Sequence, residues 1–253
     1  MGDSMKNEKI GVFDSGLGGL SILNELRKIL PNENYLFYED SINNPYGEKT
    51  EEELFEITSR IVEYLIKKNC KLIVIACNTA TTSCINKLRD KYKNMIFVGT
   101  VPAIKMAYDV NSKSTLLLAT SYTIKSERVK ELLHDYTGIN QNIYVESGKN
   151  LANLIEEGNI NKIKDLLNEI LLPYKNNIDS IVLGCTHYPL VKNIIEEIIP
   201  NVKVLDGSFG VAKETRHQLI ENNLLNESNE QGDIIIENSK SQDLVQRSYE
   251  ILG

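Results

Sequence analysis

The sequence predicts an α/β fold of two similar domains with mainly parallel sheets, and three observations support this prediction. Apolar runs rich in β-branched residues recur along the chain, and stretches with helical spacing of apolar residues lie between them. Two of the runs also end alike, as LIVIACNTA at 72–80 and SIVLGCTHY at 180–188, with a cysteine at the same point. Continuous apolar strands separated by helices are typical of parallel sheets that are covered on both faces.

The first part of the chain alternates between strand and helix patterns. A glycine-rich turn, DSGLGGLS, joins the first strand to the first helix, and Pro31 ends that helix. Thr50 with Glu53 three residues later forms a capping box that opens a long helix. Strands are predicted at 9–13, 34–38, 71–76 and 95–98, and helices at 20–29, at 50–68 and directly after Cys77.

The remainder of the chain repeats this alternation. Strands are predicted at 114–119, 142–145, 179–183, 202–205 and 233–236, and helices at 150–157, 161–173, 189–198, 210–222 and 241–251. In parallel sheets, ligands bind beyond the carboxyl ends of the strands. The glycine-rich turn and the two cysteines lie at such ends, so we expect them to converge on one crevice between two similar halves.

Composition and charge exclude several classes of function. The chain has 253 residues, 42% of them apolar, and a net charge of -7, so it has no general attraction for nucleic acid or anionic membranes. We see neither an apolar run long enough to span a membrane nor the apolar stretch of a secretory signal, and we expect a cytoplasmic protein. The cysteine and histidine spacings match no metal ligand set, so no metal site is expected.

Two of the four cysteines are candidates for chemistry. Cys77 and Cys185 each lie just beyond a strand and near a predicted helix start, where the helix field favours a thiolate. A buried, inert thiol is the competing interpretation, and the residues alone do not decide between the two. For Cys70 and Cys84 we favour the inert interpretation.

Polar residues beside these strand ends are candidates for binding. Asp14 can face an ammonium group and Ser15 can donate or accept a hydrogen bond, although a tightly packed turn would explain the same glycine-rich sequence. Asn78 and Thr79 follow the first cysteine, and Thr186 and His187 follow the second. His187 can also exchange a proton with a neighbouring thiol. The NNPYGEK segment, taken by itself, reads as an ordinary turn.

Five segments in this order resemble bacterial glutamate racemase, of the aspartate/glutamate racemase superfamily: FDSGLGGLS, NNPYGEKT, IACNTATT, GTVPAIK and GCTHYPL. The resemblance extends from about Lys9 to Gly253. It implies an isomerase that interconverts L- and D-glutamate for peptidoglycan biosynthesis, and so for cell wall biogenesis and cell shape, with neither pyridoxal phosphate nor metal. It also implies two α/β domains, 1–98 plus 208–253 and 99–207, with the active site between them, and a homodimer without nucleic-acid or membrane partners.

The resemblance also implies roles for individual residues. Cys77 and Cys185 match the two catalytic cysteines, one for each face of the substrate. The substrate-binding residues that it implies are Asp14, Ser15, Tyr46, Gly47, Asn78, Thr79, Thr186 and His187. Glu156 matches a supporting glutamate, and Thr120 with Thr123 matches a loop that lines the pocket. The chain departs from the family at Gly148 and Lys149, where relatives often have Cys-Pro.

Other functions remain open from the sequence. A related racemase could act on aspartate or another acid, because the side-chain pocket cannot be read from the motifs. A hydrolase or transferase with a cysteine nucleophile would need only one of the two thiols and would form an acyl-enzyme. A two-lobed amino-acid-binding protein would need neither thiol.

Overall fold

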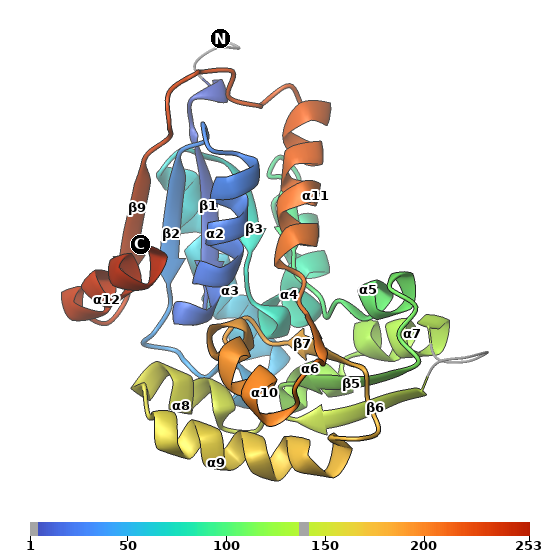
Figure 1. Cartoon of the computed structure of the whole chain (residues 1–253). Coiled ribbons are helices and arrows are strands. Elements are labelled where there is room, and N and C mark those ends of the chain that lie inside the picture. The colour runs from blue at the N-terminus through green and yellow to red at the C-terminus, as the bar shows by residue number, and fades with distance from the viewer. Residues whose placement is uncertain (1–4, 137–141) are drawn as a thin grey trace. The chain divides into compact units, whose positions relative to one another are not determined.

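The computed structural model describes residues 5–136 and 142–253 and divides the chain into two compact units (Figure 1). Unit 1 comprises Met1–Thr100 with Ser208–Gly253, and unit 2 comprises Val101–Gly207. Each unit contains one sheet, and every strand pair in the two sheets is parallel. The sequence prediction of an α/β fold with parallel sheets is therefore confirmed.

Unit 1 has a five-stranded sheet in the order β4-β3-β1-β2-β9. Its strands are β1 (Lys9–Asp14), β2 (Tyr35–Glu39), β3 (Cys70–Ile75), β4 (Phe97–Gly99) and β9 (Ile234–Asn238). The strand β3 is buried along its whole length, as its apolar, β-branched sequence predicts. β1 and β3 are neighbours in the sheet, so their carboxyl ends lie side by side.

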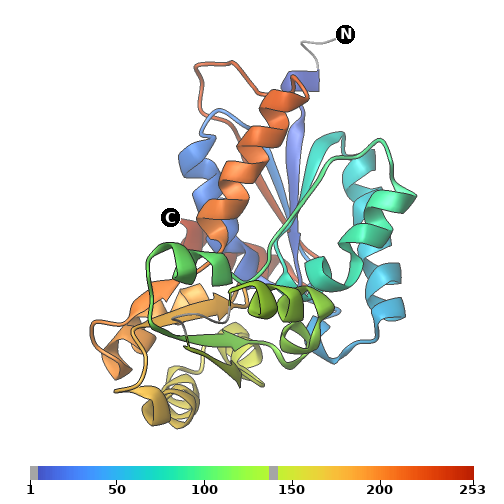
Figure 2. The ribbon, with the colours of Figure 1, turned by 90° about the vertical axis from the view of Figure 1, so that its right-hand side faces the viewer.

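Helices cover both faces of this sheet. They are α2 (Leu20–Ile29), α3 (Glu51–Lys67), α4 (Asn78–Lys91), α11 (Ser208–Glu221) and α12 (Gln242–Leu252), with short 3-10 helices η1 (Leu17–Gly19) and η2 (Tyr46–Glu48). Figure 2 shows the sheet between the pair α2 and α11 on one face and the pair α3 and α4 on the other. The predicted capping box opens α3, because Thr50 accepts the Glu53 N–H and Glu53 accepts the Thr50 N–H.

The outer edge of β9 is protected by a tyrosine. The Tyr249 hydroxyl, from α12, accepts the N–H of Ile236 at 3.1 Å and donates to the carbonyl of Ile234 at 3.2 Å. These two backbone groups face away from β2, on the side where a further strand would pair. The side chain therefore replaces a neighbouring strand at this edge.

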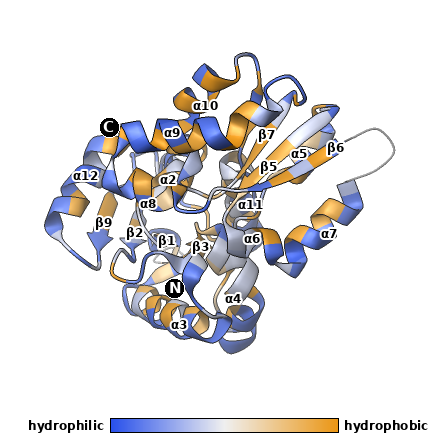
Figure 3. Cartoon of the chain, turned by 90° about the horizontal axis from the view of Figure 1, so that it is seen from below, coloured by the Kyte–Doolittle hydropathy of each residue, from blue (hydrophilic) through white to orange (hydrophobic). Residues whose placement is uncertain are grey.

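Unit 2 has a four-stranded sheet in the order β6-β5-β7-β8. Its strands are β5 (Ser114–Ala119), β6 (Asn142–Ser147), β7 (Ser180–Gly184) and β8 (Lys203–Leu205). Its helices are α5 (Ile104–Asp109), α6 (Ser121–Lys125), α7 (Glu127–Tyr136), α8 (Leu151–Glu157), α9 (Ile160–Leu171) and α10 (Lys192–Ile198), with short 3-10 helices η3 (Leu172–Tyr174) and η4 (Tyr188–Val191). Orange and blue segments alternate along α9 in Figure 3, because its apolar residues recur once a turn and face the core.

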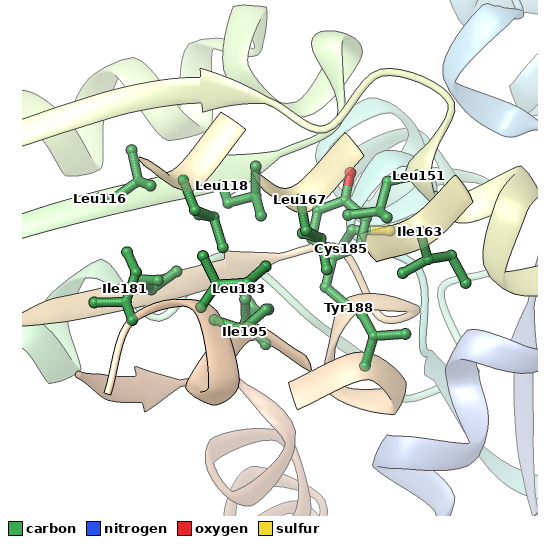
Figure 4. Packing of buried hydrophobic residues seen from close by; sticks show 14 of the residues in the cluster. Leu116, Leu118, Leu151, Ile163, Leu167, Ile181, Leu183, Cys185, Tyr188 and Ile195 are labelled. Atoms are coloured by element: carbon green, nitrogen blue, oxygen red, sulfur yellow. The ribbon is translucent and has the colours of Figure 1, made fainter. Parts of the chain in front are cut away.

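The two faces of this sheet pack into separate clusters. On one face, alternate residues of β5 and β7, such as Leu118 and Leu183, pack against α9 and α10 (Figure 4). Cys185 and Tyr188 belong to the same cluster. On the other face, Leu117 and its neighbours pack against α5 and α7. The strand that carries the second cysteine is thus fixed from both sides.

Several elements differ from the sequence predictions. The helices α5, α6 and α7 lie where no element was predicted, and the helix predicted at 189–198 is a 3-10 turn with Pro189 followed by α10. The helix predicted at 161–173 ends at Leu171, since Pro173 lies in a following 3-10 turn. Among the described residues, no helix combines the length and the apolar character needed to cross a bilayer.

Candidate active site

In unit 1, the predicted site residues lie at the carboxyl edge of the sheet. Asp14 is the last residue of β1 and is fully buried, and Cys77 follows β3 by two residues and is 5% exposed. The N–H of Ala76 donates to the carbonyl of Phe13 at 2.8 Å, which keeps the two chains paired beyond the end of β3. The segments that carry Asp14 and Cys77 therefore lie side by side at the carboxyl ends of β1 and β3.

The glycine-rich turn packs closely on Asp14. A Cβ at Gly19 would lie 2.8 Å from the Asp14 Cβ and 2.8 Å from the Phe37 ring, so only glycine fits without a shift. Ser15, the next residue along the turn, is buried as well. The turn thus holds Asp14 and Ser15 against the sheet edge, and the close packing at Gly19 is the feature that the interpretation as a tightly packed turn predicts.

Cys77 is the residue that caps the amino end of α4. Its carbonyl accepts the N–H of Thr81 at 2.9 Å. The Thr81 hydroxyl donates to the carbonyl of Ile75 and accepts the N–H of Thr100, both at 3.1 Å, which fastens the helix start to β3 and β4. The unpaired N–H groups at a helix start carry partial positive charge, and this field stabilises a thiolate.

Asn78 and Thr79 form the first turn of α4 and are both buried. The Asn78 Oδ1 atom is buried and has no hydrogen-bond partner among the described residues. A buried amide oxygen without a partner costs free energy, and a donor on a bound ligand would remove that cost. An amino group is such a donor.

Tyr46 lies at the start of η2 and is 2% exposed. Its hydroxyl donates to Asp40 Oδ2 at 2.7 Å. Burial raises the pKa of Tyr46 well above its usual value, and the charge and hydrogen bond of Asp40, with the charges of Cys77 and Asp14, act in the same direction. Tyr46 is therefore a neutral phenol close to Cys77 and Asp14, and Gly47 follows it in the same turn.

In unit 2, Cys185 follows β7 directly and is 7% exposed. Its Sγ lies 3.8 Å from Nδ1 of His187, which is 2% exposed. The other ring nitrogen, Nε2, lies 2.6 Å from Glu156 Oε1 on α8. A thiol, an imidazole and a carboxylate thus form a chain in which the imidazole can exchange a proton with sulfur.

Tyr188 fixes the turn that carries Cys185 and His187. Its side chain is fully buried, and its hydroxyl donates to the Gly148 carbonyl at 3.0 Å. Burial, with a smaller contribution from the charge of Cys185, raises the pKa of Tyr188 well above its usual value. A Cβ at Gly148 would overlap this hydroxyl, so in this chain only glycine fits here without a shift of Tyr188.

The other candidates are three threonines and the two thiols expected to be inert. Thr186 is buried between Cys185 and His187, and Thr120 caps α6 by accepting the Thr123 N–H at 3.1 Å. The thiols predicted to be inert are buried, and burial raises the pKa of Cys70 to about 12 and raises that of Cys84. Across residues 5–136 and 142–253, no cluster of three or more His, Cys, Asp or Glu could hold a metal ion.

Two residues of these sites were not predicted. Asp40 had only a weak signal, because it lies two residues beyond the strand predicted at 34–38, and Glu39 is the residue that follows this strand as Asp14 follows the first. Tyr188 lies in the GCTHYPL segment, but its contact with Gly148 joins residues 40 positions apart and leaves no local pattern. Each unit nevertheless brings one predicted cysteine together with its predicted neighbours.

Comparisons with known proteins agree with this geometry. Residues 32–211 match the family described as Asp/Glu/Hydantoin racemase. The glutamate racemase of Clostridium perfringens (strain SM101 / Type A) is 43% identical over 244 residues, which are 94% of each chain.

Solved structures extend the likeness to the fold. The glutamate racemase of Francisella tularensis in complex with D-glutamate superposes with a TM-score of 0.82 at 29% identity, over 98% of this chain and 94% of that one. The Escherichia coli glutamate racemase, in complex with L-glutamate and the activator UDP-MurNAc-ala, superposes with a TM-score of 0.83 at 29% identity. The match covers 97% of this chain and 96% of that one. This chain belongs to the Asp/Glu/hydantoin racemase family, and within it to the glutamate racemases.

Proposed function

We propose that this chain interconverts L-glutamate and D-glutamate by two-thiol chemistry and supplies D-glutamate for peptidoglycan. One observation carries the proposal. Each of two α/β units holds a buried cysteine at the carboxyl end of a central strand, beside side chains suited to an amino acid. Family membership supports the same substrate, because the relatives above are glutamate racemases and two of their structures hold glutamate.

The reaction needs an acid and a base of the same kind on opposite faces of the substrate. One thiolate removes the α-proton, and the electron pair of the broken C–H bond is delocalised toward the carboxylate. The opposite thiol then gives its proton to the other face of the same carbon, so the two sulfur atoms exchange protonation states in each turnover. Because the reverse reaction uses the same steps, Cys77 and Cys185 take equivalent roles.

The neighbours of the cysteines supply binding and charge stabilisation. In unit 1, the first turn of α4 offers N–H groups and the Asn78 and Thr79 side chains, which suit the developing charge of a carbanion. Asp14 and Ser15 bind the ammonium group, and Tyr46 with Gly47 forms the neighbouring wall. In unit 2, Thr186 and His187 belong to the half of the site around Cys185, and Glu156 holds the His187 imidazole in place.

The remaining features of the proposal concern the whole molecule. The domains are 1–98 plus 208–253 and 99–207, with the site in the crevice between them. The reaction uses neither pyridoxal phosphate nor a metal, since thiols alone supply the acid and the base. The protein works in the cytoplasm as a homodimer, without nucleic-acid or membrane partners.

Proton exchange in deuterated water tests this function. The protein is incubated separately with L- and D-glutamate, without added pyridoxal phosphate or metal, and the α-proton signal is followed by NMR together with optical rotation. We expect both enantiomers to lose the α-proton signal and to converge on zero rotation, and aspartate to react more slowly. Binding of glutamate without exchange would contradict the proposal and favour a binding protein, and an isolated acyl-enzyme would favour a hydrolase or transferase.

A further inference from the structure

Asp40 is a buried carboxylate next to the unit 1 site. It follows β2 directly and is 2% exposed. Its N–H donates to the carbonyl of Asp14 at 2.9 Å, which extends the pairing of β1 and β2 by one residue. The preceding carboxylate, Glu39, instead accepts hydrogen bonds from Ser248 on α12 and Asn238 on β9. Successive strand residues point to opposite sides, so the two acids serve different surroundings.

The Asp40 carboxylate closes the loop that leads to the PYG turn. Its Oδ2 accepts the Tyr46 hydroxyl at 2.7 Å, and both of its oxygens lie 2.9 Å from Nδ2 of Asn43. The Asn43 N–H also donates to the Asp40 carbonyl at 3.1 Å. One buried carboxylate thus fixes both the middle and the end of this loop, and with it Gly47.

The hydrogen bond to Asp40 also decides what Tyr46 can do. A phenol has a single O–H to donate, and here the hydrogen bond it makes is accepted by Asp40. The phenol stays protonated, since burial and its acidic neighbours raise the pKa of Tyr46. The hydroxyl is therefore no donor toward a substrate, although it lies close to Cys77 and Asp14.

We propose that Asp40 is a positioning residue for the Cys77 half of the site, which holds the Tyr46–Gly47 turn in place and directs the phenol proton away from the substrate. This inference rests on the proposed racemase function. Asp40 and Cys77 both lie close enough to Tyr46 for their charges to act on its phenol, so a negative charge at Asp40 also disfavours a thiolate at Cys77, whereas the amino end of α4 favours it. Asp40 thereby acts on the chemistry through Tyr46 and through its charge.

The variant Asp40→Asn tests this role, because it keeps the shape of the side chain and removes the charge. We expect kcat/KM for glutamate to fall by roughly tenfold to a hundredfold, as for the loss of a hydrogen bond to a charged group. In the pH profile of kcat/KM, the limb to which Cys77 contributes moves to lower pH, because a thiolate there becomes easier to form. A profile that superposes on that of the unmodified protein after scaling would overturn the inference.

Three further variants separate positioning from simple loss of stability. Glu39→Gln removes the neighbouring buried carboxylate, so it lowers stability but leaves both limbs of the pH profile in place. Tyr46→Phe removes the shared hydrogen bond and keeps the charge, so its pH profile does not move to lower pH. Combined with Asp40→Asn, it costs less than the sum of the two single effects, since both remove one interaction. Additive effects would contradict the proposal.

Asn43→Ala removes the other donor to the same carboxylate and is the milder test should Asp40→Asn not fold. We expect it to raise KM for both enantiomers by about threefold or more, the effect of a weakened hydrogen bond. An unchanged KM would overturn the positioning role. An unmodified protein without activity on glutamate would instead mean that the proposed function itself has failed.

Discussion

Glu156 Oε1 lies 2.6 Å from His187 Nε2, on the side of the imidazole opposite to Cys185. The His187 ring is almost fully buried, and the carboxylate comes from the short helix α8 rather than from the turn that carries the histidine. A carboxylate in this place fixes the orientation and the tautomer of the ring, as in other sites where an imidazole serves a nucleophile. The contact therefore joins two parts of unit 2 around one thiol.

The variant Glu156→Gln tests the function of this contact. We expect kcat to fall by about tenfold to a hundredfold, because an amide holds the ring less firmly than a carboxylate does. KM should change little, since the substrate gains no contact with Glu156 itself. Steady-state kinetics in both directions measure this, and Glu157→Gln, an exposed carboxylate on the same helix, is the control. Equal loss in both variants would remove the special role of Glu156.

Gly148 gives a test of the packing beside Cys185. Gly148→Ala places a methyl group where the Tyr188 hydroxyl lies, so we expect a loss of about 1–3 kcal/mol in the free energy of unfolding. Activity should fall as well, because Tyr188 directly follows His187. Gly210→Ala is the control, since nothing lies within 4 Å of its new Cβ and alanine favours the helix by up to about 1 kcal/mol. Urea denaturation of the two variants should therefore give shifts of opposite sign.

The buried thiol of Cys70 should make the stability of the fold depend on pH in the alkaline range. Burial raises its pKa from the usual 9.0 to about 12 in the folded protein. Between these values the unfolded chain loses a proton that the folded chain keeps, so the contribution of this thiol is complete below pH 9.0 and is lost as the pH rises toward 12. Cys70→Ala should therefore flatten the decline by about 1.4 kcal/mol per pH unit in this window. Denaturation at several pH values measures the slope, and parallel slopes for the two proteins would contradict the assignment.

Tyr249 predicts the behaviour of a sheet edge. Tyr249→Phe removes the two hydrogen bonds to β9 and leaves the N–H of Ile236 and the carbonyl of Ile234 without their present partner. We expect a loss of about 1 kcal/mol in stability and more self-association than in the unmodified protein. Sedimentation over a range of concentrations checks this, with Tyr108→Phe as the control for an exposed tyrosine in unit 2. Identical sedimentation of all three proteins would show that the edge needs no such protection.

The sequence predicted the central strands because burial on both faces leaves an uninterrupted apolar run. The strands β1, β3 and β7 carry this signal, and it led directly to Asp14, Cys77 and Cys185. The helices α5 and α6 have no such signal, as they are six and five residues long and bury only a few side chains. The helix α7 buries only Val129 and Leu132, so its apolar stripe is too narrow to identify by period alone.

Contacts between distant segments were beyond the reach of the sequence patterns. The bonds of Glu156 with His187 and of Tyr188 with Gly148 depend on how α8 packs beside η4, and no local motif encodes that packing. The burial of Glu39 likewise depends on β9 and α12, some two hundred residues later in the chain. The rule that identified Asp14, an acid directly after a predicted strand, would have selected Glu39 rather than Asp40, because Glu39 is the residue that pairs with Asp14.

The most direct test of the two-thiol account is to measure which enantiomer of glutamate first gains deuterium from the solvent. The protein is incubated with L-glutamate in deuterated water, and at low conversion the deuterium content of recovered L-glutamate and of new D-glutamate is measured separately. Because one thiol removes the proton and the other delivers one from solvent, we predict deuterium in the D-glutamate and almost none in the recovered L-glutamate. Cys77→Ser and Cys185→Ser should each abolish D-glutamate formation. Early deuterium in the recovered L-glutamate, or full activity of either variant, would contradict the account.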